Sequence, residues 1–484
     1  MLIDEFDLNM DAASTISASK QMADALKCAI IKGAIRPGFV LPSVRDLAGQ
    51  LNISRSTASR AIEALSAQGY VVAERGSGTR VASHLPGQSQ ELLPASIVAR
   101  DVALSRFGEW LKQRHEIGKT STKLHYDGPR LRDLPLNIWR ELLVKHCRST
   151  IDEEVSYVPE PFGFPPLREA YVSYLIRARA AKVTQERLAV FASRNLRLDL
   201  ICRLLLDEGD VIAMEDPGFF VGREQFLAIG AKVVPIDVDG QGMVVEQLET
   251  LAVPPRLIYC TPSHQAPTGA VMPMGRRKKL LDYAAAHDAY IIEDDYDSEF
   301  RYDGRPLPCL QGMDTNDRTI YLSCLWTVMA PVSRIGFMVV PETLVAAMNA
   351  AKCLVERDVS LVEQAAIADF INEGHLEKLI RRQRTKHAAQ RQIVINKLES
   401  ILGKSVWIAP ESAGLEVLVR FETAYHSEQI EKAIADSGMP MYSTAAYYMS
   451  APRPLEYVIA FAGTDEEELS LIVEKFASQL ARLA

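Results

Sequence analysis

Most of this chain alternates between short apolar runs and longer stretches with helical periodicity, and this alternation restricts the possible folds more than any other feature. From about residue 104 onward, apolar runs typical of buried strands occur at 188–191, 211–214, 232–236, 256–259, 290–293, 319–322 and 336–340. Buried strands that alternate with helices form a mainly parallel sheet covered on both faces. The sequence therefore predicts an α/β core.

The last part of the chain, residues 406–484, has a different pattern. Strand-like segments at 415–421 and 455–461 accompany helical segments at 427–437 and 465–482. We expect a small C-terminal α+β subdomain after the parallel sheet. A chain of 484 residues is also long enough for two or three domains.

The first part of the chain is predicted to be a separate, mainly helical domain. Ser43 and Ser54 are in the positions of N-caps, before helices predicted at 44–51 and 55–68, and a further helix is predicted at 19–33. Two short strands, 70–74 and 79–82, follow around a glycine-containing tip. Three helices and a hairpin predict a winged helix-turn-helix.

This small domain is basic although the whole chain is acidic. Residues 15–85 contain nine Lys and Arg against four Asp and Glu, whereas the net charge of the chain is −8. A basic end on an acidic body is expected where one end meets DNA phosphates. The alternative is a small basic domain with solvated arginines. The residues that we expect to contact DNA are Arg45, Ser54, Arg55, Ser56, Thr57, Arg60 and Gly76.

The motifs of this domain resemble the GntR family of winged-helix DNA-binding domains. The resemblance rests on Leu41-Pro-Ser-Val-Arg-Asp-Leu-Ala48, on Ile53-Ser-Arg-Ser-Thr57 and on Gly76-Ser-Gly-Thr79. It implies that Arg45, Arg55, Thr57 and Gly76 face DNA. It also implies a homodimer that binds a double-stranded operator through paired half-sites. We expect the DNA-binding domain at 12–83, a linker at 84–104 and an effector or dimerisation domain at 105–484.

The larger domain resembles a fold type I aminotransferase joined to such a head, as in MocR or GabR-like regulators. The matching segments are Tyr126–Pro129 with Trp139, Phe162–Arg168, Glu215–Gly218, Thr261–Gly269, Ile292–Arg301 and Arg334–Gly336. In such a site a carboxylate holds the pyridine nitrogen of pyridoxal phosphate protonated. The resemblance assigns that role to Asp294, the ring's 3-oxygen to Tyr296 and the ring face to Phe219. It places His264 and Gln265 at the ring edge and Arg334 at the phosphate. The alternative is that Asp294 and Tyr296 form a turn pair and that Arg334 forms a surface ion pair.

The chain departs from this family pattern at two positions. Thr327 stands where the resemblance places the Schiff-base lysine, 31 residues after Tyr296 and seven before Arg334. A threonine has no amine with which to form an imine. The loop expected to hold the phosphate reads Phe191-Ala-Ser-Arg194, with Ser193 in place of a glycine. Arg194 either supplies charge there or blocks the phosphate.

Four functions remain open at this point. We expect a DNA-binding transcription regulator whose degenerate aminotransferase-like domain senses a small molecule or serves as a dimer scaffold, with no catalytic residue and no covalent cofactor. The alternatives are a pyridoxal phosphate-dependent aminotransferase, or a regulator that binds pyridoxal phosphate or a similar effector non-covalently. A purely structural body without any ligand is the fourth possibility.

Cysteine usage and hydropathy indicate the compartment. The seven cysteines are scattered and form no CxxC pair, which is typical of reduced thiols and not of a disulfide framework or a zinc site. We therefore expect no metal. The chain has neither a bilayer-length apolar run nor a basic leader at its N-terminus. We expect a cytoplasmic protein without a membrane partner.

Overall fold

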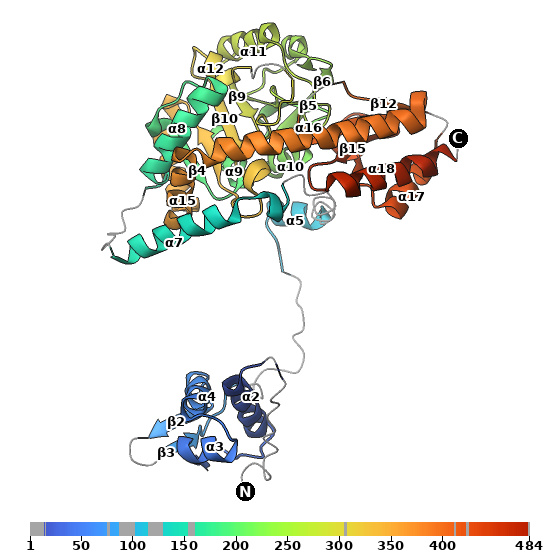
Figure 1. Cartoon of the computed structure of the whole chain (residues 1–484). Helices are drawn as coiled ribbons and strands as arrows, with labels where there is room; N and C mark the ends of the chain where they lie inside the picture. The colour runs from blue at the N-terminus through green and yellow to red at the C-terminus, as the bar shows by residue number, and fades with distance from the viewer. Residues whose placement is uncertain are drawn as a thin grey trace. The chain divides into compact units, whose positions relative to one another are not determined.

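The computed structural model describes residues 14, 16–74, 78–86, 102–114, 129–152, 160–303, 307–410, 413–422 and 425–482. The chain divides into two compact units, Met1–Ala103 and Leu104–Ala484, which we call the head and the body (Figure 1). No helix of the described residues has both the length and the apolar character to cross a membrane.

The head is a winged helix-turn-helix, as predicted. Its helices are α2 (Ala18–Ile31), α3 (Val44–Gln50) and α4 (Arg55–Ala67), and its strands are β1 (Val40–Leu41), β2 (Val71–Glu74) and β3 (Gly78–Val81). The strands form an antiparallel sheet in the order β1-β3-β2. Leu26, Ala58 and Leu65 are buried where the helices meet. Strand β1 was not predicted, because two residues are too few to show any periodicity.

The centre of the body is an eight-stranded sheet in the order β4-β11-β10-β9-β8-β5-β6-β7. Neighbours from β10 through β6 run parallel, whereas β11 is antiparallel to both β10 and β4, and β7 is antiparallel to β6. The strands are β4 (Leu188–Phe191), β5 (Val211–Asp216), β6 (Lys232–Asp239), β7 (Gly242–Met243), β8 (Leu257–Cys260), β9 (Tyr290–Asp294), β10 (Thr319–Cys324) and β11 (Gly336–Val339). The predicted mainly parallel sheet is confirmed.

Helices cover both faces of this sheet, and alternate strand residues face opposite layers. Val190 packs in one core cluster with Tyr171 of α8, whereas Ala189 and Phe191 pack in another with Leu198 of α9. The body helices before the small subdomain are α5 (Arg106–Gln113), α7 (Leu136–Asp152), α8 (Pro165–Arg179), α9 (Arg194–Leu205), α10 (Phe220–Ala228), α11 (Met274–Ala286), α12 (Leu310–Met313), α13 (Trp326–Met329), α14 (Val345–Val355), α15 (Leu361–Asn372) and α16 (His375–Leu402).

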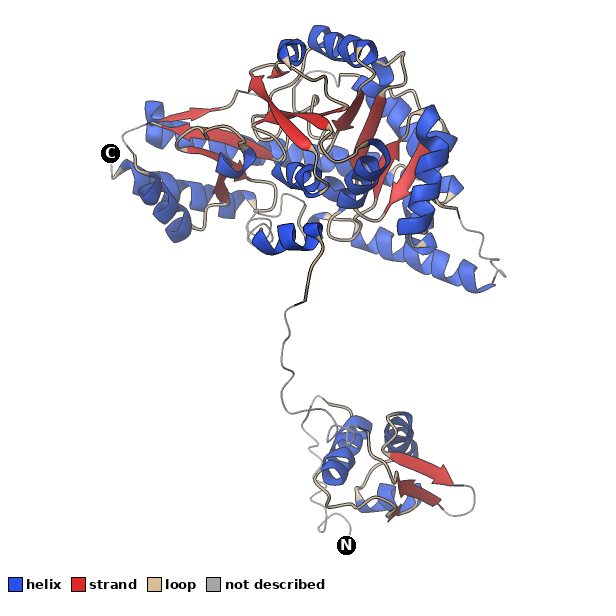
Figure 2. Ribbon diagram, turned by 180° about the vertical axis from the view of Figure 1, so that it is seen from behind, coloured by secondary structure: helices blue, strands red, loops and turns tan. Residues whose placement is uncertain are grey.

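The small C-terminal subdomain contains a four-stranded antiparallel sheet in the order β12-β13-β15-β14. Strands and helices of this subdomain lie near the C-terminus in Figure 2. Its elements are β12 (Val406–Ile408), β13 (Glu416–Phe421), α17 (Ser427–Ser437), β14 (Met441–Ser443), β15 (Glu456–Ala460) and α18 (Glu466–Ala481). The predicted α+β character is confirmed. Strands β12 and β14 were missed because each has three residues.

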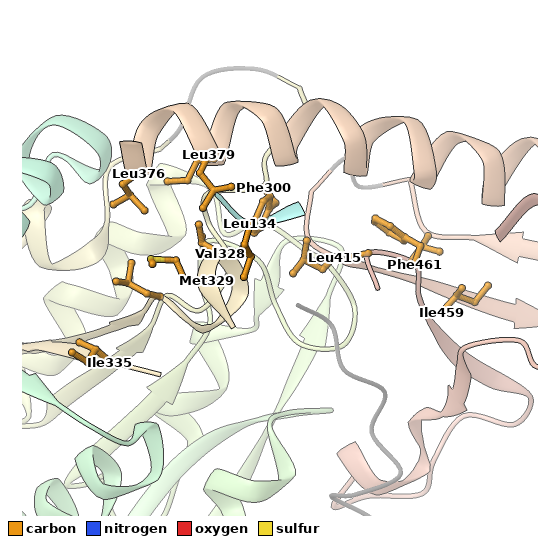
Figure 3. Packing of buried hydrophobic residues seen from close by; sticks show 14 of the residues in the cluster. Leu134, Phe300, Val328, Met329, Ile335, Leu376, Leu379, Leu415, Ile459 and Phe461 are labelled. Carbon is orange, nitrogen blue, oxygen red and sulfur yellow. The ribbon is translucent and has the colours of Figure 1, made fainter. Parts of the chain in front are cut away.

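The long helix α16 connects this subdomain to the large one. Leu376 and Leu379 of α16 share a buried cluster with Val328 and Met329 of α13 (Figure 3). These contacts anchor α13, the short helix that contains Thr327. The position of residue 327 is therefore set by the core and not by a surface loop.

Candidate functional site

The N-terminal turn of α4 carries most of the residues predicted to contact DNA. The Ser54 hydroxyl accepts a hydrogen bond from the Thr57 amide at 3.1 Å, which caps the helix. The hydroxyls of Ser56 and Thr57 lie 2.8 and 2.7 Å from that of Ser54. Arg45, Arg55 and Arg60 have exposed side chains. Gly76 lies outside the described residues.

The body brings its predicted site residues together around Asp294. This carboxylate is the last residue of β9 and is 2% exposed. Tyr259, on the neighbouring parallel strand β8, donates its phenolic proton to Asp294. In α/β sheets, ligands bind at the carboxyl ends of parallel strands, which is where these two side chains meet. Tyr259 was not predicted as a site residue. It ends an apolar run typical of a buried strand, and such a run does not show that its tyrosine makes a polar contact.

Arg194, the first residue of α9, is the ionic partner of Asp294. Its guanidinium nitrogen lies 2.5 Å from a carboxylate oxygen of Asp294. The carbon at the centre of the guanidinium is 4.2 Å from the ring centroid of Phe219 and 5.8 Å from that of Tyr296. Burial lowers the pKa of Arg194, but the attraction of Asp294 outweighs it, and the pKa lies above its ordinary value. The guanidinium therefore stays charged between a carboxylate and two aromatic rings.

Tyr296 connects Arg194 to two further predicted residues. Its phenolic oxygen lies 3.0 Å from Nδ1 of His264, which is also 2.8 Å from a carboxylate oxygen of Asp297. Burial, followed by the charge of Asp297, raises the pKa of Tyr296 well above its ordinary value, so the phenol stays protonated. Thr327 is buried and donates its hydroxyl proton to the carbonyl of Tyr296 at 3.1 Å.

Two predicted residues make contacts of a different kind. Gln265 is fully buried and donates to the carbonyls of Pro217 and Ala266, each at 2.8 Å. Its contacts hold the loop after β8 and do not include the Arg194–Asp294 pair. The exposed Arg334 lies over the ring of Trp326, 5.0 Å from the ring centroid.

The loop before α9, where the phosphate was expected, contacts a carboxylate. The amide of Ala192 donates to a carboxylate oxygen of Glu356 at 2.8 Å. The other oxygen of Glu356 lies 2.8 Å from the ammonium group of the buried Lys352. Burial lowers the pKa of Lys352 from its ordinary value. Ser193 has a φ of −139°, an extended conformation that needs no glycine. The spacing of Lys352 and Glu356 predicts a helical ion pair, but nothing in the sequence connects that pair to this loop.

A small hollow lies beside Tyr296, between the loop after β8 and the small subdomain. Its lining includes His264, Tyr296 and Glu416. Gly414, with a φ of +77°, crosses the edge of this region, and a Cβ atom there would stand 2.0 Å from Cε1 of His264. Glycine is thus required at this point both for the backbone conformation and for the close approach.

Comparison with known proteins agrees with both units of the fold. Residues 18–81 match the family of bacterial regulatory proteins called gntR, and residues 131–476 match aminotransferase class I and II. The probable rhizopine catabolism regulatory protein MocR of Rhizobium meliloti is 31% identical over 471 residues, covering 96% of this chain and 93% of that protein. The pyridoxine biosynthesis transcriptional regulator PdxR of Corynebacterium glutamicum is 26% identical, and 96% of each chain is covered.

A solved structure supports the fold of the body. The kynurenine aminotransferase of Pyrococcus horikoshii has a TM-score of 0.68 and 23% identity, covering 82% of this chain and 98% of that one. A helix-turn-helix head with a fold type I aminotransferase body defines a class of transcription regulators, and the head implies DNA binding. This chain belongs to the MocR-like regulators of the GntR family.

Proposed function

We propose that this regulator binds a double-stranded operator as a homodimer and that its aminotransferase-like domain works without covalent pyridoxal phosphate. The observation that carries this proposal is residue 327. Its hydroxyl lies against the backbone of Tyr296, and no lysine occurs between Lys279 and Lys352. Without an amine at this position the site beside Asp294 lacks the group that would form an imine with the aldehyde, so the domain senses or supports instead of catalysing.

Other residues of the site also fit pyridoxal phosphate poorly. The carboxylate that would hold the pyridine nitrogen is already paired with Arg194. The amide of Ala192, in the loop where the phosphate would bind, already donates to the carboxylate of Glu356, which would repel a phosphate. Lys352, a lysine near this loop, is fully buried and paired with Glu356. These contacts support the absence of the covalent cofactor.

Chemical trapping tests this proposal. Purified protein is incubated with pyridoxal phosphate and reduced with borohydride, and the modified lysines are located by peptide mass spectrometry. We expect labelling on exposed lysines alone, with none in the peptides that line the pocket of Asp294. The Thr327→Lys variant is the matched control, since it restores an amine at the position in question. A reduced imine inside the body of the wild-type protein would overturn the proposal.

A second candidate function is a regulator that responds to non-covalent pyridoxal phosphate. The retained Asp294, Tyr296 and Phe219 favour it, as does the similarity to a relative whose name refers to pyridoxine biosynthesis. In either case an effector acts only through its different affinities for two arrangements of the protein. Titration of pyridoxal phosphate into operator-bound protein separates the two functions, because only the second predicts a change in DNA affinity.

The expected division of the chain belongs to this proposal. Residues 12–83 read DNA, residues 84–104 link the two parts, and residues 105–484 bind the effector and the second subunit. Sedimentation velocity measures the assembly directly. A dimer is expected for the full chain and for residues 105–484, whereas a dimer that forms only with residues 12–83 present would place the subunit contact in the head.

A further inference from the structure

The most unusual feature of the body is an arginine inserted between a buried carboxylate and an aromatic ring. Arg194 pairs with Asp294 at 2.5 Å and lies 4.2 Å from the centroid of Phe219. We propose that the position of the Arg194 guanidinium, between Asp294 and Phe219, is a subsite for planar cations, that the guanidinium is its built-in occupant, and that this occupant keeps ring-shaped ligands out. This inference builds on the proposed function, since it explains how a domain without the covalent cofactor fills the space beside Asp294.

The negative charge of the buried Asp294 carboxylate requires a cationic partner. Asp294 is 2% exposed and also accepts a hydrogen bond from the Tyr259 phenol. A buried carboxylate without a cationic partner is strongly unfavourable, so a molecule that displaces Arg194 must bring a positive charge of its own. The ligand class is therefore cationic. A neutral or anionic ring that entered the pocket would leave both Asp294 and Arg194 unpaired.

The contacts of the Arg194 guanidinium suit a flat group. A guanidinium is planar, spreads its charge over the plane, donates hydrogen bonds at its edge and stacks on aromatic faces. A protonated pyridine has the same four properties. Arg194 makes both contacts that such a ring would make, an N–H directed at Asp294 and a face against Phe219. Asp294 and Phe219 are two of the residues to which the family resemblance assigned contacts with the cofactor ring.

The other arginines of α9 show that this arrangement is not a general property of the helix. Arg197 is fully buried and donates to the carbonyl oxygens of Ser323 and Phe337. Arg203 forms a helical ion pair with Asp199, and its side chain is 63% exposed. Arg194 is the one member of this set that joins a buried carboxylate to an aromatic face. Arg203 therefore provides a matched control on the same helix.

Chemical rescue of an arginine deletion tests the proposal. Full-length Arg194→Ala, Arg203→Ala and wild-type proteins are melted with methylguanidinium chloride, with pyridoxine, or with tetramethylammonium chloride at equal ionic strength. Pyridoxine carries the protonatable ring without an aldehyde or a phosphate, so it cannot form imines with lysines. We expect methylguanidinium and pyridoxine to raise the melting temperature of Arg194→Ala by several degrees. The other two proteins should not respond, and tetramethylammonium should have no such effect.

The result is decisive in both directions. Equal responses of Arg194→Ala and Arg203→Ala, or binding of pyridoxine to the wild-type protein as tight as to Arg194→Ala, would overturn the proposal. If Arg194→Ala does not fold, Arg194→Gln replaces it, because the amide keeps an N–H donor while the charge is lost. That variant must bind pyridoxine at least tenfold more tightly than wild type, and equal affinity rejects the subsite. The proposed function fails by a different observation, an imine trapped in the wild-type body.

Discussion

Single side chains decide what this molecule can do chemically. The body brings together a buried carboxylate, a phenol and an aromatic ring, and it has a hydroxyl at residue 327. Arg194 pairs with the carboxylate, which belongs to Asp294, and lies near the rings of Phe219 and Tyr296. In the head, the first residue of α4, Arg55, has an exposed side chain, and we expect it to contact DNA bases.

Replacement of Arg55 tests the recognition helix. Arg55→Ala should weaken binding to the DNA sequence that the protein selects from a random pool by about 1–3 kcal/mol, because a bidentate contact to a base edge is lost. Fluorescence anisotropy with selected and scrambled DNA measures this change. The control is Arg203→Ala in the body, which should leave affinity unchanged. Full affinity of Arg55→Ala would show that another part of the head reads the bases.

The carboxyl group of Glu299 should make stability depend on pH. Burial, helped by the charge of Asp295, raises its pKa to about 7 from an ordinary value of 4.5. The folded protein therefore binds a proton that the unfolded chain releases, and stability falls as pH rises from about 4.5 to about 7. The largest loss is roughly 3 kcal/mol, at about 1.4 kcal/mol for each pH unit.

Glu299→Gln should remove this part of the pH dependence, since an amide does not ionise and can still accept the hydrogen bond from Tyr174. Urea unfolding at pH 5 and pH 8 measures the difference. The free energy of unfolding of the variant should change less between the two pH values than that of the wild type. An unchanged difference would mean that Glu299 does not hold its proton in the folded state.

At the scale of elements, the ends of helices and strands position the side chains of the two candidate sites. Ser54 caps α4 and Ser43 caps α3, because the hydroxyl of each accepts a hydrogen bond from a backbone amide. In the body, the ends of β8 and β9 place Tyr259 and Asp294 side by side, and the start of α9 brings Arg194 to them. The function of each element thus depends on where it begins or ends.

Removal of the α4 cap should loosen the recognition helix. Ser54→Ala loses the acceptor for the Thr57 amide, which costs about 1 kcal/mol of helix stability. Hydrogen–deuterium exchange in the full chain should show faster exchange across the first turn of α4. Ser66→Ala, in the last turn of the same helix, is the control and should exchange at the wild-type rate. Equal exchange in both variants would argue against the cap.

Much of the fold could be predicted because the strands of the large sheet are apolar and regularly spaced. Helix 427–437 was predicted with the bounds that α17 has. The strands that were missed, β1, β7, β12 and β14, have two or three residues each, which is too few to show a periodicity.

The candidate site was predicted less completely. Asp294, Tyr296 and Phe219 lie close in space around Arg194, but their roles stay predictions. Neither the pairing of Arg194 with Asp294 nor that of Glu356 with Ala192 could be read from the sequence. Both join residues that are 100 or more positions apart, and only the folded sheet brings them together.

At the scale of the whole molecule, charge is divided between the two units. The chain has a net charge of −8, whereas residues 15–85 are basic. A basic head attracts DNA, and an acidic body discourages non-specific contact with it. We therefore expect DNA affinity to depend on the head and to be sensitive to salt.

The salt dependence of DNA binding tests this division. Affinity for the selected DNA should fall steeply and linearly on a log–log plot as salt rises, because phosphate contacts release counterions. Arg45→Ala and Arg60→Ala should each reduce the slope by about one unit if these side chains contact phosphates. Anisotropy titrations at several salt concentrations give the slopes. A flat response would mean that the basic surface of the head does not meet the DNA backbone.

The close approach of Gly414 to His264 has a consequence for how the body can vary. The backbone of the small subdomain touches the imidazole where even a methyl group would overlap it. The methyl group of an alanine at 414 would overlap His264. It would displace the imidazole from its neighbours Tyr296 and Asp297. The small subdomain can approach His264 this closely only because residue 414 has no side chain, and one added methyl group would push the two apart.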